Sequence, residues 1–95
     1  MHEPQIVMEG IPINPSDFGL NSRVELIQIS KDNIGIVKRR KSRILMKDGI
    51  IISRIITQIK SKLPKTKISL VISGPICSKT ISYLENYNVR IIREN

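Results

Sequence analysis

Hydrophobic and polar positions in the first half of the chain alternate, and this pattern predicts strands. Residues 24–29 alternate apolar and polar side chains as a half-buried strand does. Residues 30–33 (Ser, Lys, Asp, Asn) have turn chemistry, because Asp and Asn side chains bond the local backbone. Residues 34–38 then return as the second strand of a hairpin. Residues 43–47 are a third apolar-centred stretch, and if the chain stays extended from residue 34 as far as Met46, the charges lie mid-strand between apolar ends.

The spacing of apolar residues changes after Asp48. Positions 52, 55, 56, 59 and 63 are apolar, which is helical spacing. We therefore expect a helix over residues 49–63, with Asp48 as its cap or as a turn residue. Lys60 and Lys62 favour a helix C-terminus, and Pro64 ends the helix.

The last third of the chain predicts a strand, a helix and a strand. Residues 67–72 have a buried-strand pattern, residues 73–75 break it, residues 76–87 form the helix and residues 89–93 form the last strand. A crossover of this length makes the two strands parallel. The expected fold is α+β, or a small α/β domain, in which two helices pack on a mixed sheet. That sheet joins an N-terminal hairpin or meander to the C-terminal strand-helix-strand unit.

The N-terminal residues 1–22 contain three prolines and two glycines, which predict an extended arm before a single domain at 23–95. A short strand is expected at residues 5–8. The arm has too many apolar residues for a solvated tail, so we expect it to pack on the domain or on a second subunit. The arm or a sheet edge is the candidate contact of a homodimer.

Positive charge is concentrated in one part of the chain. Residues 34–67 carry eleven Lys and Arg against one acid, whereas the whole chain has a net charge of +8. A localised block of this kind attracts polyanions, and nucleic acid is the first candidate. No apolar run is long enough to span a membrane. The single cysteine excludes an intramolecular disulfide and suits a reducing cytoplasm.

The densest charge lies at residues 38–43, where five of six side chains are basic. On an exposed strand or hairpin tip these side chains would meet successive phosphates, and arginine also stacks on bases. A solvated sheet edge needs only one or two charges. We therefore expect largely sequence-independent binding of DNA or RNA, with a slight preference for single strands because an exposed arm needs no groove. The predicted contacts are Lys38, Arg39, Arg40, Lys41, Arg43, Lys47 and Arg54.

Residues 73–80 end a predicted strand and open a predicted helix, which is the context of a phosphate-binding loop. Lys79 and Thr80 fit the end of that pattern, but Ser73 and Ser78 replace its two glycines. Nucleotide hydrolysis is therefore not expected. A helix start with Ser78, Lys79 and Thr80 would suit one phosphate of a nucleic-acid backbone. The simpler interpretation is a serine-capped helix after a turn.

Tyr83 and Tyr87 lie four residues apart and share one helix face, where they either stack on unpaired bases or pack at the core periphery. Cys77 lies near a helix N-terminus, which lowers a thiol pKa, but there is no second cysteine and His2 is the only histidine. An enzyme centred on Cys77 or Ser78 is the least favoured hypothesis.

The sequence lacks the residues that a metal site or a cofactor site would need. One cysteine and His2 cannot form a zinc site. A metal-dependent nuclease of the three-strand, helix, strand kind needs a Glu-x-Lys motif, and the third stretch supplies only Lys47 and Asp48. The sequence thus predicts a nucleic-acid-binding protein that is not an enzyme and has no metal or cofactor. The alternative is a non-catalytic accessory subunit that docks on an acidic protein partner.

Overall fold

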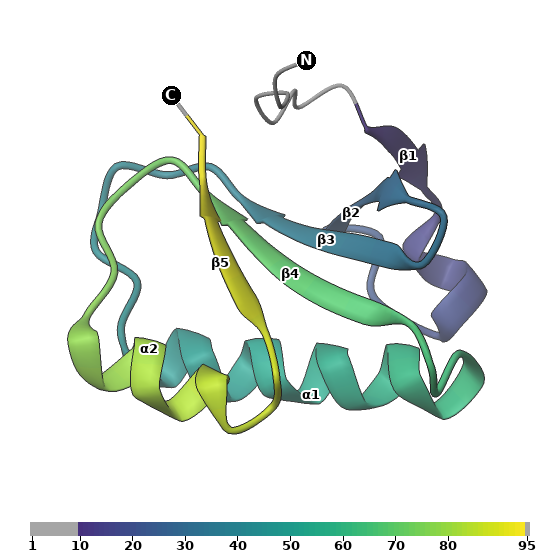
Figure 1. Ribbon diagram of the computed structural model, residues 1–95. Coiled ribbons are helices and arrows are strands. Elements are labelled where there is room, and N and C mark those ends of the chain that lie inside the picture. Colours follow the sequence, from purple (N-terminus) through teal and green to yellow (C-terminus); the bar gives the residue numbers. More distant parts are fainter. Residues whose placement is uncertain (1–9, 95) are drawn as a thin grey trace, which may run out of the picture.

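The computed structural model describes residues 10–94 (Figure 1). The strand expected at residues 5–8 and His2 lie outside these residues. The described elements are β1 (Ile11–Ile13), the 3-10 helix η1 (Pro15–Phe18), β2 (Glu25–Ser30), β3 (Asn33–Lys38), α1 (Met46–Lys62), β4 (Lys67–Ile72), α2 (Ser78–Glu85) and β5 (Arg90–Arg93).

The strands form one five-stranded sheet in the order β1-β2-β3-β4-β5. β1, β2 and β3 are an antiparallel meander, and β3, β4 and β5 run parallel. Both α1 and α2 lie on the same face of the sheet (Figure 1). The predicted α+β fold with a mixed sheet and two helices is confirmed. Neither described helix is long and apolar enough to cross a bilayer.

The main core lies between the sheet and the two helices. Alternate strand residues such as Ile36 and Leu70 point to this side and are completely buried. Ile52 and Ile59 of α1 and Leu84 of α2 meet them with the apolar faces predicted from helical spacing. Each such side chain contributes about 1.5–3 kcal/mol by leaving water. The helices are therefore held firmly against the sheet, and the loops that join them to the strands are fixed at both ends.

The opposite sheet face carries a smaller apolar cluster. Ile27, Val37 and Val71 are buried there, with Ile29 and Ile92 partly buried beside them. This cluster lies toward the carboxyl ends of β3 and β4, where Val37 pairs with Val71, whereas Asn33 pairs with Lys67 at the start of the two strands. The face is therefore polar where β3 and β4 begin and apolar nearer to where they end.

Residues 10–22, expected to belong to an arm, add to the domain. β1 pairs with β2, and Phe18 of η1 is buried in the main core. The Asn14 side chain accepts the backbone N–H of Ser16 at 3.1 Å, which caps η1. Gly19 ends η1 with a φ of 70°, a left-handed conformation that glycine adopts without steric cost.

The extended chain expected as far as Met46 is a wrong prediction. β3 ends at Lys38, and α1 begins at Met46, three residues before the predicted start. The carboxylate of Asp48 accepts the backbone N–H of Leu45 at 2.9 Å, so Asp48 stabilises the helix start from inside the first turn. Lys38 is therefore the last residue of β3, and the rest of the basic run, residues 39–43, lies in a loop and not on a strand or a hairpin tip.

Candidate functional site

Two loops meet at the carboxyl ends of the parallel strands. The β3–α1 loop (residues 39–45) and the β4–α2 loop (residues 73–77) are joined by backbone hydrogen bonds. The N–H of Ile44 donates to the carbonyl of Pro75 at 3.0 Å, and the N–H of Cys77 donates to the carbonyl of Ile44 at 2.9 Å. Figure 1 shows both loops rising together beyond the ends of β3 and β4. We call this end of the molecule the carboxyl edge; in open α/β sheets it is where ligands usually bind.

Gly74 makes the close approach of the two loops feasible. A Cβ atom at this position would lie 2.2 Å from the carbonyl oxygen of Arg40, well inside contact distance. Two segments were predicted from the sequence to contact phosphate, residues 38–43 and residues 73–80. They therefore lie side by side in the structure.

The carboxyl edge is strongly basic. Eight bases and three acids lie on its strand ends, loops and helix starts, which leaves a net charge of +5. The bases are Lys38, Arg39, Arg40, Lys41, Arg43, Lys47, Lys79 and Arg93, and the acids are Glu25, Asp48 and Glu94. Arg93 was not among the predicted contacts; it belongs to this edge because it pairs in register with Ile72 at the end of β4.

Arg39 forms ion pairs with two glutamates of the protein itself. Its Nη1 donates to Glu25 at 2.6 Å and its Nε to Glu94 at 3.1 Å. The hydrogen bonds that Arg39 donates to Glu94 and Glu25 raise the pKa of its guanidinium above its ordinary value. Arg39 therefore links the start of β2 to the residue that follows β5. Its hydrogen bonds serve the fold and not the binding of a ligand.

Arg40 also forms an ion pair within the protein. Its Nη2 donates to Asp48 at 2.6 Å and to the carbonyl of Arg43 at 3.2 Å. Partial burial opposes ionisation of Asp48, but the Leu45 N–H and the Arg40 guanidinium outweigh it, so the pKa of Asp48 lies below its usual range. This pair fixes the β3–α1 loop against the first turn of α1.

The remaining bases of the carboxyl edge face solvent. Lys41, Arg43, Lys47 and Lys79 are exposed, and none of them forms an ion pair with another residue in the range 10–94. Lys38 is half-buried at the end of β3. Of the predicted contacts, these residues are the ones that the structure leaves available to an external anion, whereas Arg54 lies further along α1, two turns from its start.

The start of α2 lies next to Arg43. The thiol of Cys77 at the N-cap has its pKa lowered by the backbone N–H groups of Lys79 and Thr80, and the positive charge of Arg43 adds to this effect. Ser78 and Lys79 are exposed, as phosphate contact requires. Thr80 is completely buried, and its methyl group packs 2.9 Å from where a Cβ of Gly49 would lie. The Thr80 side chain therefore does not reach the surface, and the phosphate contact predicted for it is wrong.

The two tyrosines lie between the helices. Their ring centroids are 5.4 Å apart at an angle of 58°, and both rings pack against the main core. The hydroxyl of Tyr83 bonds the hydroxyl of Ser53 on α1 at 3.1 Å, and that of Tyr87 at 3.4 Å. This hydrogen-bonded chain places Tyr83 and Tyr87 at the α1–α2 contact, apart from the basic loops.

The acids of the carboxyl edge are dispersed. Glu25 and Glu94 both bond Arg39, whereas Asp48 bonds Arg40, so Glu25 and Asp48 belong to separate ion pairs. Within residues 10–94, no three His, Cys, Asp or Glu side chains are grouped so as to hold a metal ion.

Comparisons with known proteins give one solved structure and no sequence relative. No family model matches the chain, and no curated protein matches it. The chain is similar to the crystal structure of a repair endonuclease from Pyrococcus abyssi, with a TM-score of 0.61 and 12% sequence identity. The match covers 76% of this chain but 32% of that chain, so it corresponds to about a third of the neighbour. At this identity the two proteins share a fold.

Proposed function

We propose that this protein binds nucleic acid at the carboxyl edge and does not catalyse a reaction there. One observation carries the proposal: the junction of the β3–α1 and β4–α2 loops brings Lys41 and Arg43 to the same edge as Lys79, and none of the three is paired within residues 10–94. The fold shared with a repair endonuclease is consistent with this function.

The proposed mechanism is neutralisation of backbone phosphates. Each cation that meets a phosphate releases counterions, so affinity falls steeply with salt and depends little on base sequence. Arg43 can also stack on an exposed base. Neither described helix stands away from the sheet as a groove-reading helix would, so we retain a preference for single strands of DNA or RNA.

Two further properties belong to the proposal. The protein would act in the reducing cytoplasm, where Cys77 stays a free thiol. A homodimer would form through the edge of the sheet at β1, where Ile11 is 70% exposed on a strand that has one neighbour among the strands of residues 10–94.

Fluorescence anisotropy tests the proposal with a mixed-sequence single strand and the matching duplex, between about 50 and about 200 mM salt. The variant Lys41→Gln/Arg43→Gln/Lys79→Gln removes three charges from the carboxyl edge. The control Lys31→Gln/Lys60→Gln/Lys65→Gln removes three charges from the other end of the strands and helices. If all three edge cations meet phosphates, the slope of log affinity against log salt decreases by about 2 for a single strand.

The results separate the hypotheses. Absence of binding at low salt contradicts the proposal, and equal losses in both triple variants show that the edge is not the contact surface. Cleavage of either substrate by the wild-type protein in the presence of Mg²⁺ contradicts the absence of catalysis. Binding to polyglutamate but not to nucleic acid would favour an acidic protein partner instead.

A further inference from the structure

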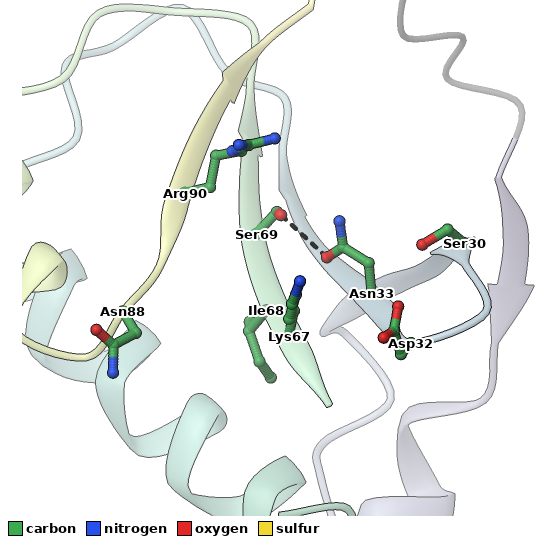
Figure 2. A pocket seen from close by; sticks show the side chains of 8 residues that line it. All are labelled: Ser30, Asp32, Asn33, Lys67, Ile68, Ser69, Asn88 and Arg90. Carbon is green, nitrogen blue, oxygen red and sulfur yellow. Dashed lines mark hydrogen bonds between the residues drawn. The ribbon is translucent and has the colours of Figure 1, made fainter. Parts of the chain in front are cut away.

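A second polar site lies at the opposite ends of the same strands, on the sheet face that the helices leave uncovered. The register pairs Asn33 with Lys67 and Ser69 with Arg90, so these four residues are neighbours across β3, β4 and β5. They line a hollow of about 400 Å³, shown in Figure 2. Ser69 and Arg90 lie three residues before Ile72 and Arg93, so the near side of this hollow is about 10 Å along the strands from the carboxyl edge.

A buried hydrogen bond organises the hollow. Ser69 is only 2% exposed, and its hydroxyl bonds Asn33 Oδ1 at 3.0 Å. Since this bond holds the amide oxygen, the amide nitrogen is turned toward the hollow, as Figure 2 shows. The Lys67 ammonium and the Arg90 guanidinium point into the same space. Three groups that only donate hydrogen bonds therefore line one hollow beside the Ser69–Asn33 hydrogen bond.

The charge of the hollow favours an anion. Lys67 and Arg90 form no ion pair with any residue between 10 and 94. Asp32 is the one carboxylate among the lining residues, so the hollow keeps a net charge of +1. A single carboxylate beside two cations does not suit a metal ion.

Apolar side chains cover Gly35, the neighbour of Ser69 on β3. A Cβ at Gly35, which pairs with Ser69, would lie 2.8 Å from Ile29 and 3.2 Å from Val71. These side chains already fill the space above Gly35 and exclude water from it.

We propose that this hollow binds the phosphoryl group of a nucleotide-sized ligand. Lys67 and Arg90 would neutralise the phosphate, Asn33 would donate to one of its oxygens, and Ser69 would act as a positioning residue. Phosphate presents enough acceptor oxygens for all three donors, and a hollow of about 400 Å³ falls within the usual size range of small-ligand sites. The site is independent of the carboxyl edge, and its ligand is either a free nucleotide or the phosphorylated end of a strand.

NMR titration of the full chain tests this site with inorganic phosphate, 5′-AMP, adenosine and a 5′-phosphorylated oligonucleotide. We expect the Asn33 side-chain amide and the Arg90 Nε–H signals to shift and saturate with phosphate and 5′-AMP, and not with adenosine. Lys67→Gln and Arg90→Gln should each weaken 5′-AMP binding about tenfold or more. Asp32→Asn should strengthen it, because it removes the opposing charge, and Lys65→Gln is the matched surface control.

Failure of this proposal can be distinguished from failure of the proposed nucleic-acid binding at the carboxyl edge. The triple variant at the carboxyl edge should bind 5′-AMP as the wild type does; a loss there would overturn the independence of the site. Equal binding of 5′-AMP by wild type and Arg90→Gln, with both folded by circular dichroism, would overturn the proposal. Tighter binding of the phosphorylated oligonucleotide than of its unphosphorylated form identifies a strand end as the source, and tighter binding of 5′-AMP than of either identifies a free nucleotide.

Discussion

Replacing Gly74 with alanine tests the contact between the two basic loops. The new Cβ would lie 2.2 Å from the carbonyl oxygen of Arg40, whereas ordinary contact begins at 3.4 Å. One loop must therefore move by about 1 Å, and overpacking of this kind costs about 1–3 kcal/mol. The Arg40 segment is held by its bond to Asp48 and Gly74 by the strand before it, so neither loop relaxes freely. For a chain of this length we expect a melting temperature lower by roughly 10 °C.

Thermal and urea denaturation measure this loss, and the anisotropy assay measures its effect on binding. Gly19→Ala is the matched control, because alanine at a φ of 70° costs about 1 kcal/mol at a site remote from the carboxyl edge. Gly74→Ala should weaken oligonucleotide binding at a temperature where it is still folded, whereas Gly19→Ala should leave binding unchanged. A stability change below about 0.5 kcal/mol for Gly74→Ala would refute the close approach.

Two other predictions follow from the same edge. Asp48→Asn should destabilise the protein by about 1–2 kcal/mol at pH 7 in urea denaturation, because Leu45 N–H and Arg40 lose a charged acceptor. Because the folded pKa of Asp48 is depressed, its stabilisation is present above the unfolded pKa of about 3.9 and is lost as pH falls through the folded value. The difference between wild type and variant should therefore shrink toward pH 3, and a constant difference would contradict this account. Cys77 should be alkylated by iodoacetamide with a midpoint at lower pH in the native protein than in urea, and coincident midpoints would show that the helix start does not stabilise the thiolate.

Periodicity in the sequence predicted most of the fold correctly. The strands at residues 24–29, 34–38 and 67–72 and the two helices all exist, because their apolar spacing matches the sides that the core buries. The start of α1 was missed, because it depends on one hydrogen bond that the Leu45 N–H donates to the Asp48 carboxylate, and apolar spacing does not report this bond. β1 was missed because a three-residue strand containing a proline has too little pattern to show alternation.

The site was predicted less completely than the fold. The basic run and the start of α2 were both named, but their meeting depends on the Ile44–Ile76 bridge, which joins residues far apart in the sequence. Charge counting also could not show that Arg39 and Arg40 are used internally, since their partners include Glu94, 55 residues away from Arg39. The hollow lined by Asn33 and Arg90 depends on strand register, which a single sequence does not determine.

The double ion pair of Arg39 also bears on the order in which the chain folds. Glu25 is 14 residues away along a meander of short connections, whereas Glu94 is 55 residues away and meets Arg39 only after α1, β4, α2 and β5 are in place. Local contacts tend to form early in folding and distant ones late. Loss of Glu25 would then slow folding, whereas loss of Glu94 would mainly speed unfolding. One guanidinium thus joins a contact that is 14 residues apart in the sequence to one that is 55 residues apart.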